Sequence, residues 1–205
     1  MAEIRRFRYI NLLIAVLLLY IMVLNIPNFL KLLYPLEHKE VIVKYGQLYK
    51  IDPSLLAALI KTESSFEPDA ESSKGAKGLM QITSSTGEWI ASIIGIKDFD
   101  ESMLFDPETN IKLGSWYIKH LEEYYKGSFD LIFAAYNGGR GNVDKWLKDK
   151  SLSSNGITLD TIPFPETRNF IEKLEKNYYI YKRIYKWEDN REQRIIDDTK
   201  DGEHI

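Results

Sequence analysis

An apolar stretch near the N-terminus constrains this 205-residue chain more than any other feature. Residues 10–24 are apolar apart from Asn11, and apolar residues resume after Asn25 and Pro27. A helix of about 20 mostly apolar residues spans a bilayer. No side of the run is polar, as the surface helix of a soluble protein requires. The run therefore predicts one N-terminal transmembrane helix, which we place within residues 1–35.

The charges on either side of this run predict its orientation. Arg5, Arg6 and Arg8 precede it, whereas the nearest positive charge after it is Lys31. Positively charged flanks stay in the cytoplasm, so we expect a single-pass anchor in the cytoplasmic membrane with the following domain on the outer face. The alternative is a cleaved signal peptide, but no small-x-small cleavage site follows the apolar core.

The composition of the chain excludes several classes of function. A net charge of −3 without a basic stripe argues against a nucleic-acid partner. The absence of cysteine excludes disulfides, thiolate catalysis and cysteine metal sites. His38, His120 and His204 form no metal-ligand pattern, so we predict neither a metal nor a cofactor. We expect one globular domain in residues 36–187, followed by a charged, disordered tail in residues 188–205.

The clearest helix signal of the exported part begins at Asp52. Asp52-Pro53 is typical of an N-cap followed by proline at the first helical position, and it predicts a helix over residues 54–63. The turn-rich segment 68–77 is expected to be a loop. No β pattern of comparable strength appears, so a mainly α fold is expected, with further helices from residue 86 and over residues 106–125, 129–136, 143–148 and 166–187.

Glu63 stands at the end of the helix predicted over residues 54–63. On a helical wheel it falls inside the apolar cluster of Leu56, Leu59 and Ile60. A carboxyl group placed there loses hydration, which raises its pKa as a general acid at neutral pH requires. Glutamate at a helix end also commonly turns to solvent or pairs with a base. The wheel alone leaves both interpretations open.

Four sequence blocks in order resemble the signature of the lytic transglycosylase SLT domain. The resemblance extends over residues 51–178, and it implies a lysozyme-like, mostly helical fold with a catalytic cleft, related to goose-type lysozyme. The residues that carry it are Glu63-Ser64-Ser65-Phe66-Glu67-Pro68, then Ser72 with Gly75-Ala76 and Gly78-Leu79-Met80-Gln81, then Ala135-Tyr136-Asn137, and last Pro165-Glu166-Thr167.

The resemblance implies a role for each matching residue. Glu63 stands where the family has its single catalytic acid and base. The positions expected to bind substrate are Ser72, Gln81 and the Met80 side chain along the cleft, Tyr136 and Asn137 near the carboxyl group, and Glu166 on the cleft wall. Each also has a structural alternative: Met80 and Tyr136 as packing, Ser72 and Gln81 as loop closure, Asn137 as a helix end, and Glu166 as a first-turn residue favoured by the helix dipole.

The implied function is an enzyme of bacterial cell-wall remodelling that acts on peptidoglycan glycan strands. It would cleave the β-1,4 bond between N-acetylmuramic acid (MurNAc) and N-acetylglucosamine (GlcNAc) without water, leaving 1,6-anhydroMurNAc ends. Ordinary glycosidases use two carboxyl groups, whereas this pattern supplies one, so Glu63 would act first as acid and then as base. The alternatives are a hydrolytic muramidase with the same acid and a non-catalytic peptidoglycan-binding scaffold.

Overall fold

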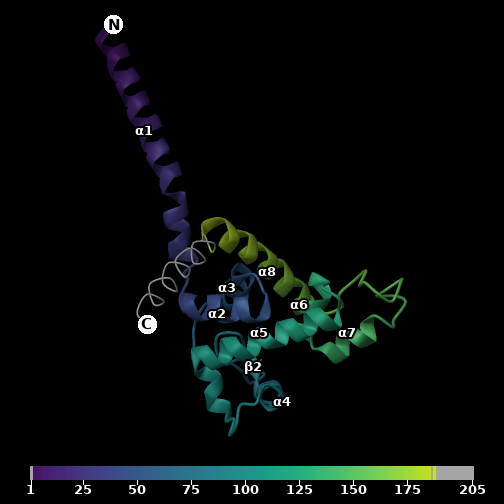
Figure 1. Ribbon diagram of the computed structural model, residues 1–205. Coiled ribbons are helices and arrows are strands. Elements are labelled where there is room, and N and C mark those ends of the chain that lie inside the picture. The colour runs from purple at the N-terminus through teal and green to yellow at the C-terminus, as the bar shows by residue number, and fades with distance from the viewer. Residues whose placement is uncertain (1, 186, 188–205) are drawn as a thin grey trace, which may run out of the picture. The chain divides into compact units, whose positions relative to one another are not determined.

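The computed structural model describes residues 2–185 and residue 187 (Figure 1). The charged tail predicted for residues 188–205 lies outside the described residues. The chain divides into two compact units, Met1–Leu36 and Glu37–Ile205.

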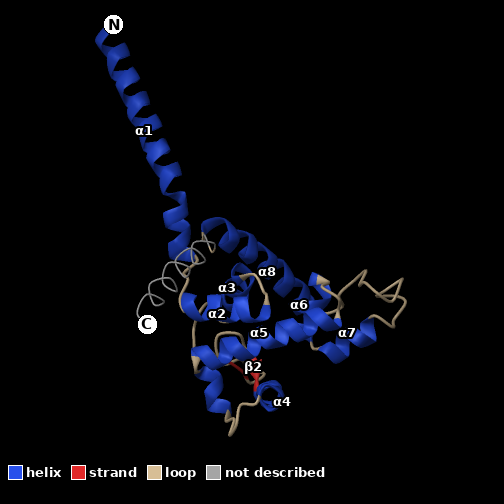
Figure 2. Cartoon of the chain, viewed as in Figure 1, coloured by secondary structure: helices blue, strands red, loops and turns tan. Residues whose placement is uncertain are grey.

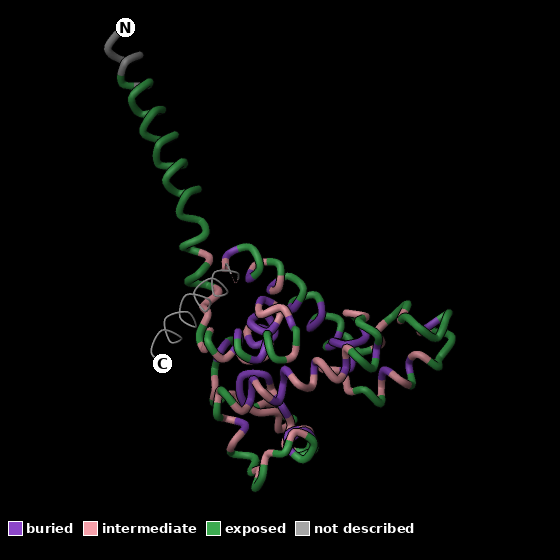
Figure 3. The backbone as a smooth tube through the Cα atoms, in the orientation of Figure 1, coloured by how far each residue is buried: buried purple, intermediate pink, exposed green. Residues whose placement is uncertain are grey.

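The first unit is built around helix α1, Ala2–Leu33. Nearly all of its residues from Tyr9 to Leu33 are exposed (Figure 3). The helix continues through Pro27, and the Asn25 side-chain amide donates to the Ile21 carbonyl at 2.8 Å, which satisfies that polar group within the helix. The segment Tyr9–Leu33 is long and apolar enough to cross a membrane, a property that signal sequences share.

The second unit is mainly helical, which confirms the predicted fold class (Figure 2). A two-stranded antiparallel hairpin and a 3₁₀ turn were not predicted, because strands of two residues are too short to show an alternating pattern. In order, the elements are α2 (Lys39–Tyr49), α3 (Pro53–Glu63), β1 (Ala76–Lys77), β2 (Ile82–Thr83), α4 (Ser84–Ile94), η1 (Glu101–Phe105), α5 (Pro107–Tyr124), α6 (Phe129–Gly138), α7 (Arg140–Trp146) and α8 (Pro165–Ile184).

Helix α3 lies in the core of the second unit. Leu56, Leu59 and Ile60 on its apolar side are fully buried, and burial of each contributes roughly 2 kcal/mol. As predicted, Asp52 caps the helix: its carboxylate accepts a 2.8 Å hydrogen bond from the Ser54 amide. The helix that carries Glu63 is therefore a fixed part of the core.

Helix α8 holds both ends of α3. At the N-terminal end of α3, the Tyr178 hydroxyl donates to the Asp52 carboxylate at 2.8 Å. At the C-terminal end, the Asn177 amide donates to the Thr62 hydroxyl and the Lys173 ammonium donates to the Thr62 carbonyl, both at 2.9 Å. These bonds fix the backbone immediately before Glu63.

Candidate active site

Glu63 is the last residue of α3, and an unusual turn follows it. Ser65 and Phe66 both adopt left-handed backbone conformations, with φ of 56° and 71°. Such conformations cost non-glycine residues about 1 kcal/mol or more each and recur at functional sites. Burial of Phe66 and a 2.9 Å hydrogen bond from the Ser64 hydroxyl to the Leu79 carbonyl hold the turn in place. The chain therefore leaves the helix axis directly after Glu63.

The Glu63 carboxyl group lies in a desolvated position. Its pKa is raised to about 8, chiefly by burial; the Lys173 ammonium lowers the pKa and the Glu166 carboxylate raises it, both by less than burial does. Among the described residues none donates a hydrogen bond to this carboxyl group, although part of the side chain remains open to solvent. A group with this pKa is mostly protonated at neutral pH, as a general acid must be. The structure thus matches the first of the two alternatives, a carboxyl group on the buried side.

Tyr136 of α6 lies near this carboxyl group. Its hydroxyl donates to the Met80 carbonyl at 2.7 Å, and its ring contacts that of Tyr117 at 5.6 Å between centroids. Burial raises the Tyr136 pKa well above its usual value, and the neighbouring Glu63 raises it further. Tyr136 therefore stays neutral and presents a fixed hydroxyl beside Glu63.

The Met80 side chain lies elsewhere than its predicted role requires. It is fully buried and packs against Gly114 of α5, where an added Cβ atom would come within 2.5 Å of the Met80 sulfur. The flexible thioether fills the space that glycine leaves, so the side chain does not line a cleft. Met80 takes part through its backbone, because its carbonyl accepts the hydrogen bond from Tyr136.

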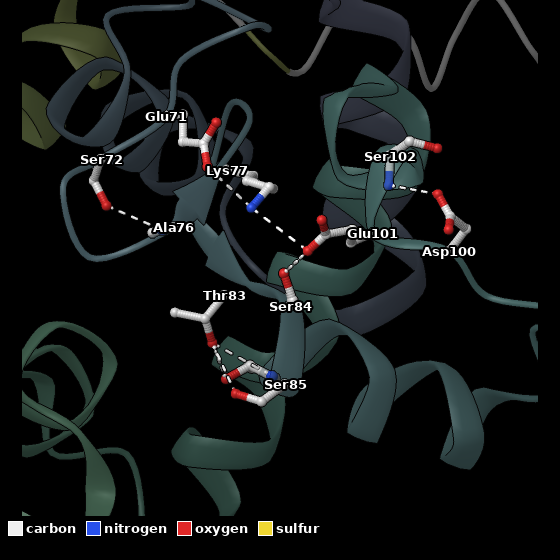
Figure 4. Close-up of polar contacts among 11 residues, drawn as sticks. Glu71, Ser72, Ala76, Lys77, Thr83, Ser84, Ser85, Asp100, Glu101 and Ser102 are labelled. Carbon is white, nitrogen blue, oxygen red and sulfur yellow. Dashed lines mark hydrogen bonds and ion pairs between the residues drawn. The ribbon is translucent and has the colours of Figure 1, made fainter.

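Gln81 and Ser72 both close the loop that precedes β1 and the hairpin. The Gln81 side-chain amide donates to the carbonyls of Ala70 and Gly78, each at 3.0 Å. The Ser72 hydroxyl accepts a 3.0 Å hydrogen bond from the Ala76 amide (Figure 4). These contacts correspond to loop closure, the structural alternative given for Ser72 and Gln81. In the part of the chain that the structure describes, neither the amide oxygen of Gln81 nor the hydroxyl hydrogen of Ser72 has a hydrogen-bond partner. Contact of these residues with a sugar stays a prediction.

A polar network joins the hairpin to η1. The Lys77 ammonium lies 3.1 Å from the Glu71 carboxylate and 3.6 Å from that of Glu101, which also accepts a 2.5 Å hydrogen bond from Ser84 (Figure 4). Single surface ion pairs contribute at most about 1 kcal/mol. This network matters for placement, since it joins the loop bearing Ser72 to the rest of the domain.

Two further predicted residues lie on or against α8: Glu166 belongs to this helix, and Asn137 of α6 contacts it. The Asn137 side chain accepts a 2.8 Å hydrogen bond from the buried Thr167 hydroxyl, which links α6 to α8. Glu166 is exposed in the first turn of α8 and forms a 2.9 Å ion pair with Lys74 of the loop. Its charge also acts on Glu63. Among the predicted residues, the Glu166 charge therefore raises the Glu63 pKa, and Glu63 raises the Tyr136 pKa. Asn137 holds α6 against α8.

Comparison with known proteins decides the family. Residues 40–155, more than half of the chain, match the family described as "Transglycosylase SLT domain". The chain belongs to this family.

This SLT domain is similar in sequence to several lytic murein transglycosylases. The chain is 28% identical to the soluble lytic murein transglycosylase of Salmonella typhimurium, covering 82% of this chain and 26% of that protein. It is 35% identical to the membrane-bound lytic murein transglycosylase C of Sodalis glossinidius, covering 66% and 44%. The chain thus spans about a quarter of the soluble relative's length.

Solved structures share the fold of this SLT domain. One is an inactive glutamate-to-glutamine mutant of the lytic transglycosylase Slt from Pseudomonas aeruginosa, with a TM-score of 0.65 and 29% identity over 77% of this chain and 27% of that one. Another is the 70 kDa soluble lytic transglycosylase from Escherichia coli, with a TM-score of 0.64 and 28% identity over 73% and 25%. The predicted fold is confirmed.

Sequence reasoning missed Asn110, which organises the GLMQ segment of this SLT domain. Its fully buried amide accepts a 2.7 Å hydrogen bond from the Met80 amide and donates to the carbonyls of Lys77 and Leu104 at 2.9 and 2.7 Å. Gly78 beside it has φ of +75°, and a Cβ there would lie 2.0 Å from the Leu104 carbonyl oxygen. The sequence did contain a signal for this role, because Asn110 lies on the apolar side of the helix predicted over residues 106–125 and a buried amide needs hydrogen-bond partners.

Missed as well was Lys173, whose ammonium lies beside the end of α3. In the sequence it is one of several lysines in a charged, tyrosine-rich helix, and nothing sets it apart. Within the described residues no group of three or more histidine, aspartate or glutamate side chains could hold a metal ion. The arrangement offers one protonated carboxyl group, a neutral tyrosine hydroxyl and a cation.

Proposed function

We propose that this chain is a peptidoglycan lytic transglycosylase that cleaves the MurNAc–GlcNAc β-1,4 bond and leaves 1,6-anhydroMurNAc ends. The observation that carries the proposal is the desolvated Glu63 carboxyl group, with its pKa raised to about 8, at the end of a helix held at both ends. The names of the relatives, lytic murein transglycosylases, support the same reaction and substrate.

In the first step, the protonated Glu63 carboxyl group donates its proton to the glycosidic oxygen. The bond between that oxygen and C1 of MurNAc breaks, and the GlcNAc side leaves as an alcohol. The positive charge left at C1 is taken up by the carbonyl oxygen of the sugar's own N-acetyl group, which replaces the second carboxyl group of ordinary glycosidases. Glu63 is now ionised, and the Lys173 ammonium favours this form.

In the second step, the Glu63 carboxylate removes the proton from the C6 hydroxyl of the same sugar. The C6 oxygen attacks C1 and closes the 1,6-anhydro ring, so no water is consumed and Glu63 regains its proton. A nucleophile already held in the same ring has a high effective concentration, which replaces the need for an activated water. We assign Tyr136 to substrate orientation, because its neutral hydroxyl lies beside Glu63.

The proposal also gives each of the remaining predicted residues a role. We assign Ser72, Gln81, Asn137 and Glu166 to substrate binding, either directly or by holding the loops that do so. For Met80 we assign only the backbone carbonyl that fixes Tyr136.

We propose further that residues 1–35 form an uncleaved anchor in the cytoplasmic membrane and that residues 36–187 act on its outer face. The length and apolar character of Tyr9–Leu33 and a membrane-bound relative support the anchor. The three arginines before the helix support the orientation. The tether then localises the enzyme to the wall next to the membrane.

Fragment mass analysis tests the activity and the reaction type together. The full chain in mild detergent is incubated with purified peptidoglycan, and the released muropeptides are weighed by mass spectrometry. Transglycosylation leaves products lighter by one water than those of a muramidase. Glu63→Gln is expected to abolish cleavage, whereas Glu67→Gln, at an exposed position four residues later, is the matched control and should cleave normally. Products carrying the added water would identify a hydrolase, and cleavage by Glu63→Gln would overturn the proposal.

A further inference from the structure

A group of partly exposed rings lies where α4 meets α5. The Trp89 ring makes edge contacts with those of Trp116 and His120, at centroid distances of 5.4 and 5.3 Å. Trp116 and His120 stack at 5.2 Å with only 8° between their planes. Trp89 is 39% exposed, although a side chain this large is usually well covered. We call Trp89, Trp116, Tyr117 and His120 the aromatic platform.

The aromatic platform is continuous with the candidate active site. Trp89 contacts Tyr117 at 6.2 Å, and Tyr117 contacts Tyr136 at 5.6 Å. Tyr136 in turn lies close enough to Glu63 for the carboxyl group to raise its pKa. Figure 1 shows the same order in the backbone, because α5 runs past α4 toward α6 and α7. A polymer held at Glu63 can therefore continue along these rings.

A positive charge lies beside the aromatic platform. Arg140, the first residue of α7, is exposed, and its guanidinium lies 3.5 Å from the His120 ring and 5.0 Å over the Tyr124 ring. Burial and this guanidinium both lower the His120 pKa, which favours the neutral imidazole. In the described part of the chain no carboxylate forms an ion pair with Arg140, and the nearby Asp144 is held by the hydroxyls of Tyr124 and Tyr125.

The chemistry of these groups selects one ligand. Flat apolar rings with polar edges suit the C–H face of a pyranose, and a guanidinium that forms no ion pair within the described residues suits a carboxylate. A peptidoglycan strand carries both, because every second sugar bears a lactyl group that ends in a carboxylate or in a peptide with carboxylates. The continuity with Glu63 favours this strand over a separate protein partner.

We propose that the aromatic platform and Arg140 form an extended subsite for the glycan strand away from the cleaved bond. A sugar ring packs on Trp89 and Trp116, and Arg140 pairs with a carboxylate of the lactyl group or of the peptide attached to it. The inference rests on the proposed function for the identity of the strand. Binding energy from such remote parts of a substrate positions the reacting sugar, so long strands should be bound and cleaved better than short ones.

Binding can be measured without turnover in the Glu63→Gln background. The full chain in mild detergent is titrated with solubilised glycan strands, either peptide-bearing or stripped of peptides by an amidase. Trp89→Ala and Trp116→Ala should each bind both kinds of strand about tenfold more weakly. Trp89→Phe should retain most of the affinity, because it keeps a ring. Arg140→Met should weaken the binding of both kinds of strand, because removal of the peptide leaves the lactyl carboxylate in its place, and unchanged binding of both would overturn the role of Arg140.

Tyr179→Ala is the matched control, because this exposed tyrosine lies on α8 outside the aromatic platform. It should leave both affinities unchanged, and near-ultraviolet circular dichroism confirms the fold of each variant. Unchanged affinity in Trp89→Ala and Trp116→Ala would overturn the subsite, even if the wild type cleaves peptidoglycan. Tryptophan-dependent binding by a chain whose wild type does not cleave would uphold the subsite and overturn the proposed activity.

Discussion

Replacement of Glu63 by glutamine is expected to stabilise the folded domain, and to do so more strongly as pH rises. The folded-state pKa is about 8, against a reference value of 4.5. Between these values the folded state binds a proton that the unfolded chain has lost, so raising the pH through this window destabilises the wild type. The glutamine side chain does not titrate and escapes this loss.

The magnitude follows from the two pKa values. Each pH unit above the unfolded pKa costs the wild type about 1.4 kcal/mol until the folded pKa is reached. At pH 7 this amounts to about 3 kcal/mol, and partial exposure of the side chain reduces it to roughly 1–3 kcal/mol. The difference in unfolding free energy between Glu63→Gln and the wild type should be close to zero at pH 4 and constant above pH 8.

Guanidinium unfolding of the full chain in detergent, followed by tryptophan fluorescence from pH 4 to 9, measures this difference. All four tryptophans belong to the second unit, so the signal reports on the domain and not on α1. Glu67→Gln, an exposed position, should show almost no pH-dependent difference. A free-energy difference for Glu63→Gln that does not vary with pH would mean that the carboxyl group is ionised and hydrated in the folded state. The argument for a general acid would then fail.

Further outcomes follow from individual contacts. Lys173→Met removes the cation that lowers the Glu63 pKa, so the alkaline limb of the pH–rate profile should move to higher pH. Glu166→Gln removes an anion that raises this pKa and should move the alkaline limb to lower pH. An alkaline limb at the wild-type pH in both variants would contradict the assignment of this limb to Glu63. Asn110→Ala removes the hydrogen-bond partner of three backbone groups, two of them in buried bonds, and should cost about 2–4 kcal/mol in denaturant unfolding. Gly78→Ala should lower stability by more than about 1 kcal/mol, since alanine meets both a positive φ and a backbone clash; an unchanged denaturation midpoint would refute this.

Features of the fold that depend on neighbouring residues were predictable from the sequence. The start of α3 followed from Asp52-Pro53, because capping is decided within one helical turn. The buried side of Glu63 followed from helical spacing, although only coordinates could exclude a turn to solvent. Motif resemblance then supplied the residues expected around it.

Features that depend on distant packing were not predictable. The burial of Met80 depends on Gly114 of another helix, and a motif position says nothing about that contact. The influence of Lys173 on Glu63 acts between residues more than a hundred positions apart. The hairpin was missed because its pairing is set by a turn and by polar contacts with η1, not by a hydrophobic pattern.

The hydrogen bonds from α8 to both ends of α3 have a consequence for folding during synthesis. The hydrogen bond from Lys173 to Thr62 joins residues 111 positions apart, and α8 is the last described helix of the chain. A chain is synthesised from its N-terminus, so α3 emerges long before the helix that fixes it. Glu63 therefore acquires its final surroundings only after α8 has been synthesised.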